Sequence, residues 1–263
     1  MSGLKTSQAV DVQVRSRGQV PRGAATYARE KVLATIDHVS EPVLAAQVKL
    51  IQAVRCSAAR PATAQAVVDV SGRPVRAHVA ASTMFEAVDL LQERLTVRLA
   101  RARRYGPRGS SGAVQEAWWD SAGHEHRPHR QHLPAEERRI ERYKSFSRNR
   151  QTPEDAVIDL EAMDYDFWVF TDLTSGYDSV VYRDVRTGRH RLASLGPVGE
   201  EPQAEGLLSV STVPVPVSTV PEAVQRLNLT GLPWVFFADT ATGRGSVLYH
   251  RYDGHYGLIT PAR

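Results

Sequence analysis

The side chains with the clearest chemical potential in this sequence are arginines at helical spacing. Arg94, Arg98, Arg101 and Arg104 recur three or four residues apart, and Glu93 is the only acidic residue among them. Cations placed along one rigid surface can contact successive phosphates of a nucleic acid. The pattern therefore predicts an RNA-binding surface that recognises shape and phosphates, without reading base sequence.

Cations earlier in the chain extend this candidate surface. Arg22 and Arg29 share one face of a predicted helix with Lys31 nearby, and other cations fall on predicted strands. The alternative for any single arginine is a solvated helix face, but these four spaced arginines taken together favour RNA. The further candidates for RNA contacts are Arg15, Arg22, Arg29, Lys31, Lys49, Arg55, Arg76 and His78.

Other chemistry finds little support in the sequence. The run HEHRPHRQH at 124–132 could bind metal, but Pro128 interrupts a helix and no carboxylate or cysteine set completes a geometry. We interpret this run as a weakly cationic tether, and a hydrolase that uses these histidines is the less favoured alternative. Trp118 and Trp119 are predicted to dock onto a domain or partner. Phosphate-binding glycine loops and nucleophile elbows are absent, so we expect no enzyme activity, cofactor or metal.

Composition and charge describe a soluble chain with two unlike halves. The 263 residues are 42% hydrophobic and 24% charged, and no apolar run is long enough to span a membrane. No signal-peptide pattern precedes the first strand, so a cytoplasmic location is expected. Residues 1–109 carry a net charge of +9, whereas residues 152–263 carry −7. A polyanionic partner is expected for the basic part and a different role for the acidic part.

Hydrophobic periodicity predicts a small α+β domain over residues 1–105. The expected order is β-α-β-β-β-α, with two helices on one face of a four-stranded sheet. Ser71-Gly72 marks a tight turn between two strands. The strands are predicted at 10–15, 43–54, 62–70 and 75–82, and the helices at 22–39 and 83–104. Residues 106–151 are predicted to be a flexible linker, with a short possible helix at 135–145.

The C-terminal half contains an internal repeat. A shift of 67 residues aligns ten identical residues between 152–182 and 219–249, among them Phe170 with Phe237 and Tyr182 with Tyr249. Each copy predicts a short helix, a hairpin and a further strand, so repeat 1 spans 152–195, a linker spans 196–218, and repeat 2 spans 219–263. Asp172 and Asp239 recur at a turn, where their side chains suit the backbone. Gly243 and Gly245 fall in a predicted hairpin turn that favours glycine.

The two hairpins are too apolar to remain uncovered. Their aromatic side chains alternate over both faces of each hairpin, and a unit of about 45 residues buries little surface alone. The sequence therefore predicts that the repeats pair, either within one chain or as a homodimer. The predicted interface comprises Phe167, Trp168, Phe170, Val180, Tyr182, Trp234, Phe236, Val247 and Tyr249.

The chain resembles the long form of the bacterial ribosome hibernation-promoting factors. The segment TPEDAVIDLEAMDYDFWVF is similar to the start of that family's C-terminal domain, and MFEAVDLLQERLTVRL is similar to part of its ribosome-binding domain. The doubling resembles the mycobacterial branch linked to hypoxia, and RTGRHRLASL departs from the family motif at the end of repeat 1. The C-terminal signature is carried by Val247, Tyr249, Arg251, Asp253, Gly254, Tyr256, Gly257, Leu258, Ile259 and Pro261.

The resemblance implies a translational repressor that acts during stress or dormancy. It implies that the N-terminal domain binds the small ribosomal subunit over the mRNA and tRNA sites, and that a single C-terminal domain joins two ribosomes. If two copies pair within one chain, single ribosomes should be stabilised instead. The alternatives left open are a ribosome-dimerising factor and a general RNA-binding regulator that acts off the ribosome.

Overall fold

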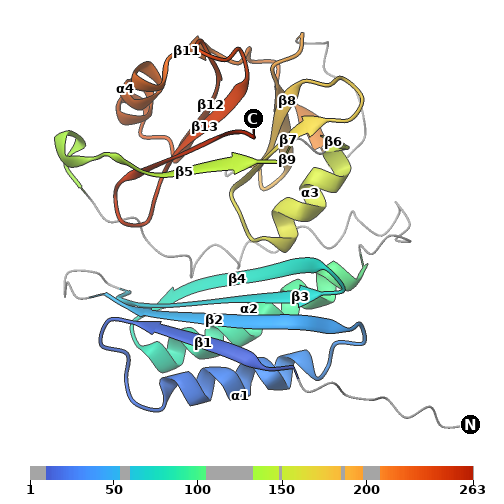
Figure 1. Cartoon of the computed structure of the whole chain (residues 1–263), viewed down its shortest axis with the longest axis vertical. Helices are drawn as coiled ribbons and strands as arrows, with labels where there is room; N and C mark the ends of the chain where they lie inside the picture. The colour runs from blue at the N-terminus through green and yellow to red at the C-terminus, as the bar shows by residue number, and fades with distance from the viewer. Residues whose placement is uncertain are drawn as a thin grey trace, which may run out of the picture. The chain divides into compact units, whose positions relative to one another are not determined.

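The computed structural model describes residues 10–53, 60–104, 133–147, 150–184, 187–197 and 208–262. The chain divides into two compact units (Figure 1). The first is built mainly from residues before 110 and the second mainly from residues after 128. The predicted α+β class is confirmed, because both units combine helices with sheets.

The first unit has the predicted β-α-β-β-β-α order. Its sheet runs β1-β2-β3-β4, with β1 parallel to β2 and the other neighbours antiparallel. Ser71 and Gly72 both have positive φ, as the predicted tight turn between β3 and β4 requires. The elements are β1 (Val12–Arg17), α1 (Ala24–Ile36), β2 (Val43–Gln52), β3 (Ala62–Val70), β4 (Arg73–Ala81) and α2 (Met84–Arg104).

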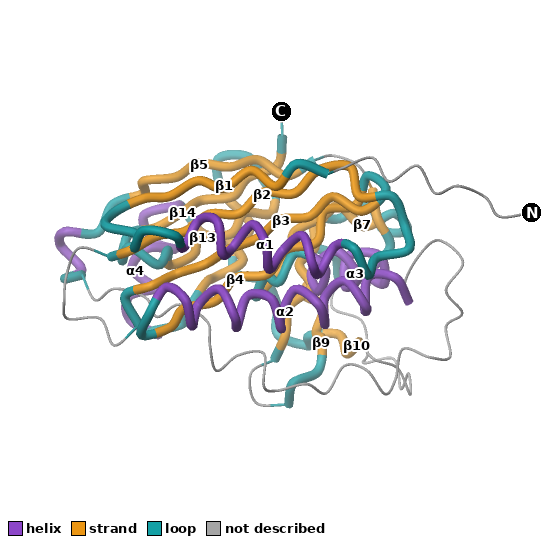
Figure 2. The backbone as a smooth tube through the Cα atoms, turned by 90° about the horizontal axis from the view of Figure 1, so that it is seen from below, coloured by secondary structure: helices purple, strands orange, loops and turns teal. Residues whose placement is uncertain are grey.

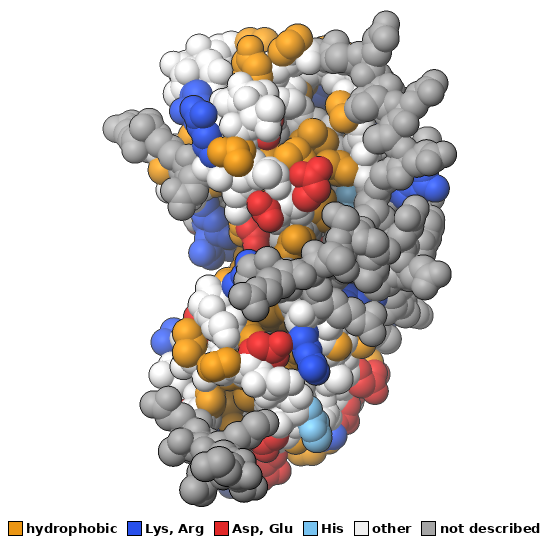
Figure 3. Space-filling model, turned by 90° about the vertical axis from the view of Figure 1, so that its right-hand side faces the viewer, with side chains coloured by type: hydrophobic (Ala, Val, Ile, Leu, Met, Phe, Trp, Pro, Cys, Tyr) orange, Lys and Arg blue, Asp and Glu red, His pale blue; other side chains and the backbone are white. Residues whose placement is uncertain are grey.

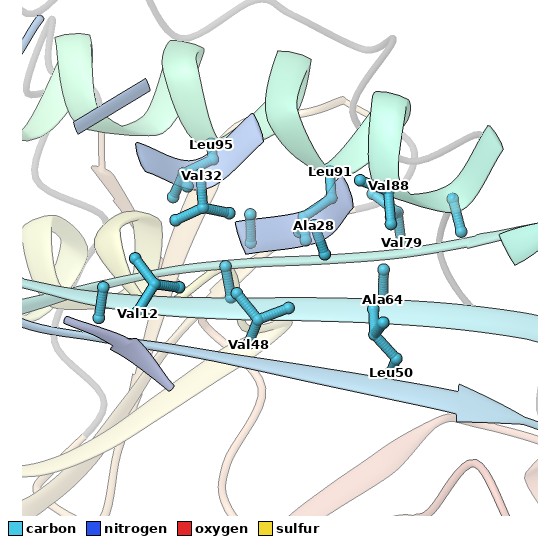
Figure 4. Close-up of a cluster of buried hydrophobic side chains, with 14 of the residues drawn as sticks. Val12, Ala28, Val32, Val48, Leu50, Ala64, Val79, Val88, Leu91 and Leu95 are labelled. Atoms are coloured by element: carbon cyan, nitrogen blue, oxygen red, sulfur yellow. The ribbon is translucent and has the colours of Figure 1, made fainter. Parts of the chain in front are cut away.

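Both helices pack on the same face of this sheet (Figure 2). Ala28 and Val32 of α1 and Leu91 and Leu95 of α2 point into one buried cluster, which also receives Val48 from the sheet (Figure 4). Alternate residues of each strand enter this core, so the residues between them lie on the opposite, open face. That alternation positions the candidate cations of the strands.

The second unit contains both repeats and two five-stranded sheets. The first sheet runs β10-β9-β8-β7-β6 and the second runs β11-β12-β13-β14-β5. The shift of 67 residues superimposes β7 and β8 of repeat 1 on β12 and β13 of repeat 2. Repeat 1 contains α3 (Pro153–Ala162), β7 (Phe167–Asp172), β8 (Asp178–Arg183) and β9 (His190–Ser194), and the short strand β6 (Arg150–Gln151) directly precedes it. Repeat 2 contains α4 (Val220–Thr230), β12 (Trp234–Asp239), β13 (Gly245–His250) and β14 (Tyr256–Pro261), and the short strand β11 (Val217–Ser218) directly precedes it.

Each sheet is completed by a strand from the segment that precedes the other repeat. Strand β5 (Ile140–Phe146) precedes repeat 1 but pairs in parallel with β14 of repeat 2. Strand β10 (Leu208–Val210) precedes repeat 2 but pairs in parallel with β9 of repeat 1. The exchange is therefore reciprocal, and it ties the two repeats together through backbone hydrogen bonds as well as side chains.

The helix predicted at 135–145 is wrong. A single 3-10 turn at Ala135–Glu137 is followed by strand β5. The charged sequence of this segment has high helix propensity, but pairing with β14 overrides that local preference. Both β5 and β10 lie in segments that the sequence assigned to linkers.

Helix α4 begins at a capping box. The Thr219 hydroxyl accepts from the backbone N–H of Glu222, whose carboxylate accepts from the Thr219 N–H at 2.7 Å. We expect Thr219→Ala to lower the free energy of unfolding of the second unit by about 1 kcal/mol, because one helix donor loses its acceptor. Urea denaturation of the full chain measures this. Thr212→Ala, in an exposed loop, is the matched control and should leave stability unchanged.

Candidate functional site

A row of polar side chains crosses the open face of the first sheet. The strand register places Arg15 beside Lys49, Lys49 beside Gln65 and Gln65 beside His78. Arg15 and Lys49 are exposed. Arg76 reaches this row from the same face, because its guanidinium donates to Gln65 Oε1 at 3.2 Å and lies 3.0 Å from His78 Nδ1. The structure thus brings together four of the predicted RNA-binding residues.

The cations of α1 have partners inside the first unit. The Lys31 ammonium lies 3.0 Å from the Asp89 carboxylate and over the Tyr27 ring. Hydrogen bonds to Asp89 and Tyr27 raise the pKa of Lys31. Arg29 donates through Nε to the carbonyl oxygen of Val12 at 3.1 Å. Both cations therefore help to hold α1 against its neighbours as well as contributing positive charge.

The remaining candidates lie on the helical side or outside the described part of the chain. Arg22 is exposed in the turn before α1. Arg94, Arg98, Arg101 and Arg104 lie along α2, although the Arg104 side chain is outside the described residues, as is all of Arg55. Arg98 is only 5% exposed, and Arg94 and Arg98 both donate to the Asp164 carboxylate, so these two do not form the predicted solvent-facing row. The other candidates are divided between the two faces of the domain. Trp118, Trp119 and the histidines of 124–132 also lie outside the described residues.

Arg17 was missed by the sequence interpretation. It is exposed at the end of β1, two residues after Arg15 and therefore on the same face of the sheet. The signal was available, because residues i and i+2 of a strand share a face. Arg17 thus adds a further exposed cation to the open face.

The second unit contains an apolar cluster shared by the two repeats. Val169 and Val180 of repeat 1 pack with Phe236 and Val247 of repeat 2, and all four are buried. Partly buried aromatic residues surround them. Seven of the predicted interface residues belong to this cluster, namely Phe167, Val180, Tyr182, Trp234, Phe236, Val247 and Tyr249.

The ring contacts across this cluster are reciprocal. Phe167 lies 5.9 Å from Tyr249, and the equivalent pair, Trp234 and Tyr182, is 5.1 Å apart. Phe167 also contacts its own equivalent, Trp234, at 5.0 Å. Contacts between equivalent residues occur at an isologous, two-fold interface. The two repeats are therefore arranged like the two subunits of a symmetric dimer.

Trp168 and Phe170 differ from the rest of the predicted interface. They belong to a separate cluster with Ala156, Val157 and Leu160 of α3. Successive residues of β7 point to opposite faces, so these two rings cover the helix of their own repeat. The Trp168 indole also donates to Gln151 Oε1 at 3.2 Å.

One ion pair crosses between the repeats near the two-fold axis. The Arg244 guanidinium donates to both carboxylate oxygens of Asp178, at 2.7 and 2.9 Å, and the Gly245 N–H donates to the same carboxylate at 2.9 Å. Asp178 is only 3% exposed. Burial raises the pKa of Asp178, but the hydrogen bonds from Arg244, Gly245 and Thr171 outweigh it, so the pKa lies below its ordinary value. Asp178 is therefore charged at neutral pH.

The turn aspartates act as the sequence predicted. Asp172 accepts from the backbone N–H groups of Thr174 and Ser175, and Asp239 accepts from that of Ala241. Gly243 has the expected positive φ of 65°. Gly245 is glycine for another reason, because a Cβ there would lie 2.7 Å from the Asp178 Cβ.

Repeat 1 buries a charged cluster where repeat 2 has neutral residues. The His190 Nε2 lies 3.0 Å from Glu161 Oε1, and Arg183 also bonds that carboxylate. In repeat 2, Asn228 stands at the position of Glu161, and it accepts a hydrogen bond from Tyr256, which pairs with His250 as His190 pairs with Arg183. Burial and the neighbouring Arg183 lower the pKa of His190 from 6.5 to about 4.

This lowered pKa predicts acid sensitivity of the second unit. The unfolded chain binds a proton at His190 below about pH 6.5, whereas the folded chain resists until about pH 4. The free energy of unfolding should therefore fall as the pH drops from 6.5 to 4. Urea titrations at several pH values should show a smaller fall for His190→Gln. His38→Gln, at an exposed histidine of the first unit, should keep the wild-type pH dependence.

The second unit also carries the acidic charge expected from the sequence. Figure 3 shows acidic side chains gathered on one face of this unit. Glu154 and Asp155 occupy the first turn of α3, where they favour the helix N-terminus. Over the described ranges, no helix is long and apolar enough to cross a membrane. Within the same ranges, no group of three or more His, Cys, Asp or Glu side chains could hold a metal ion.

Comparison with known proteins finds relatives for most of the chain. The family model described as "Sigma 54 modulation/S30EA ribosomal protein C terminus" matches twice, at residues 135–188 and 205–258. Each match begins before an exchanged strand, and thus earlier than the predicted repeat starts. Among solved structures, the chain is similar to the Thermus thermophilus Protein Y N-terminal domain, with 19% identity, a TM-score of 0.28, and coverage of 35% of this chain and 96% of that one.

Sequence relatives extend beyond the repeats. The chain is 36% identical over 212 residues to the "Dormancy associated translation inhibitor" of Mycobacterium tuberculosis, which covers 76% of this chain and 71% of the relative. It is 30% identical over 127 residues to the "Ribosome hibernation promotion factor" of Bradyrhizobium diazoefficiens, which covers 48% and 54%. The chain therefore belongs to the ribosome hibernation-promoting factor family, in the long form whose C-terminal domain is duplicated.

Proposed function

We propose that this protein is a non-enzymatic ribosome hibernation factor. It binds the small ribosomal subunit at the mRNA and tRNA decoding cleft, blocks translation and protects idle ribosomes. Support comes from its relatives, which are named as a dormancy-associated translation inhibitor and a ribosome hibernation promotion factor. Further support comes from the exposed cations Arg15, Arg17 and Lys49, which suit contacts with rRNA phosphates.

We further propose that the protein leaves ribosomes single. The observation that carries this step is the shared cluster of Val169, Val180, Phe236 and Val247, in which each repeat covers the apolar face of the other. A single C-terminal domain would need a second chain to cover the same face. Covalent connection favours pairing within the chain, because a short tether holds the partners at roughly millimolar effective concentration. The surface for joining two ribosomes is then occupied.

Sedimentation of purified ribosomes with the full-length protein tests both steps. The protein should co-migrate in stoichiometric amount with the small subunit and with monosomes at moderate salt. A mainly dimeric ribosome peak would overturn the monosome step and favour a ribosome-dimerising factor. A spread of the protein over all RNA species would favour a general RNA-binding regulator instead. Inhibition of cell-free translation provides the matching functional readout.

A further inference from the structure

The ion pair between the repeats breaks the symmetry of their interface. Asp178 and Gly245 are equivalent positions under the shift of 67 residues, and so are Tyr177 and Arg244. Repeat 1 therefore carries Tyr-Asp where repeat 2 carries Arg-Gly. The bidentate contact of Arg244 with Asp178 uses one residue from each motif.

The two motifs also fit each other in shape. An ideal Cβ placed on Gly245 would lie 2.7 Å from the Asp178 Cβ and 2.8 Å from the Phe236 ring. Real Cβ atoms do not approach this closely, so a side chain at 245 would displace its neighbours. The Asp178 side chain thus occupies space that is present only because its equivalent is glycine.

We propose that these motifs make the pairing heterotypic, so that repeat 1 binds a repeat 2 in preference to another repeat 1, and the reverse. The inference rests on the proposed pairing of the repeats within one chain. In addition, we infer that the charge and size of the residues at 177–178 and 244–245, near the two-fold axis, determine which repeat binds which. The kind of partner that fits repeat 1 is therefore a repeat 2.

A pair of two repeats 1, or of two repeats 2, would lack the ion pair between Arg244 and Asp178 and the fit of Asp178 against Gly245. Two copies of repeat 1 would bring two Asp178 side chains together at the axis, with steric overlap and like charges in a buried site. Each carboxylate would face Tyr177 in place of a guanidinium. Two copies of repeat 2 would leave the Asp178 space empty and both Arg244 side chains without this carboxylate. The apolar contacts differ as well, because Phe236 stands at the position equivalent to Val169. The variants below therefore change only the two motifs.

Variants of the full chain can test whether the Tyr-Asp and Arg-Gly motifs determine the pairing, or whether the apolar contacts alone are sufficient. The acidic chain, Arg244→Tyr with Gly245→Asp, carries the Tyr-Asp motif in both repeats. The basic chain, Tyr177→Arg with Asp178→Gly, carries Arg-Gly in both. The swapped chain combines all four substitutions and so exchanges the motifs between the repeats. Composition at the motifs is the same in the swapped chain as in the wild type.

The expected result is complementarity between chains. The acidic and basic chains alone should each unfold at lower urea concentration than the wild type. Their mixture should form a 1:1 complex with the mass of two chains, detected by native mass spectrometry with one chain isotopically labelled. The swapped chain should recover much of the wild-type unfolding midpoint and remain a single chain.

Two outcomes would overturn the inference. One is acidic and basic chains that unfold like the wild type and form no complex when mixed. The other is a swapped chain and a mixture that recover nothing, even if the acidic and basic chains alone do not fold. These measurements contain no ribosomes, so they are independent of ribosome binding. A wild-type chain that is itself a dimer would contradict intrachain pairing, while the mixing result would still report specificity.

Discussion

Val180→Asp is expected to unfold the second unit of this protein while the first unit stays folded. Val180 is fully buried in the cluster shared by the two repeats, where Val169, Phe236 and Val247 surround it. A carboxylate placed there loses its hydration without a designed partner, at a cost of several kcal/mol. Because a domain of ordinary stability has only about 5–15 kcal/mol in total, the second unit should lose its cooperative unfolding.

Hydrogen exchange of the full chain measures this outcome strand by strand. Protection should fall in β7, β8, β12 and β13, and it should persist in β1 to β4, whose core is separate. Val217→Asp is the matched control, since Val217 is a strand valine that is 73% exposed. Wild-type protection in the Val180→Asp protein would mean that the two repeat faces are not packed against each other.

The parts of this fold with strong periodicity could be predicted from the sequence. The helical stripe that contains Leu91 and Leu95 and the alternation of β3 both reflect burial against one core, so local pattern and tertiary structure agree. The hairpins could also be predicted, because their glycines and aspartates serve the turns directly. In these elements, residues that are close in the sequence determine the local structure.

The exchanged strands could not be predicted in the same way. Strand β5 has no apolar alternation that would mark it, and Tyr143 within it is 71% exposed. Its conformation depends on backbone pairing with β14, more than one hundred residues later in the chain. The Asp178–Arg244 ion pair could not be predicted from local sequence either, because the two residues meet only when the repeats pack in a two-fold arrangement. Long-range pairing of this kind leaves little trace in a single sequence.

The candidate RNA surface depends partly on local sequence pattern, which can be predicted, and partly on strand pairing, which cannot. Alternation within β1 and β2 places Arg15 and Lys49 on the face opposite the core, but only the strand register shows that they are neighbours. Arg22 and Arg101 lie on the helical side of the domain, because α1 and α2 pack on the opposite face of the sheet. A flat RNA surface cannot contact both sides equally. The division of the candidates therefore turns one predicted surface into two that can be tested separately.

Replacing Arg15 and Lys49 together by alanine is expected to weaken ribosome binding about a hundredfold at low salt. Each charge-assisted contact with a phosphate contributes about 1.5–3 kcal/mol, and each tenfold change in affinity corresponds to about 1.4 kcal/mol. The slope of log affinity against log salt should also fall by roughly 1 to 2, because fewer counterions are released. Both side chains are exposed, so the fold should not change.

Binding assays over a range of salt concentrations distinguish the two faces of the domain. Arg22→Ala with Arg101→Ala removes the same number of cations from the helical side, and Arg226→Ala removes an exposed cation from α4 in the second unit. If the open sheet face contacts rRNA, the first double variant should lose more affinity than the second, and Arg226→Ala should behave like the wild type. The reverse order would assign the contact to the helices. Equal losses in the two double variants, with a smaller loss for the single Arg226→Ala, would mean that affinity follows net charge and not a defined surface.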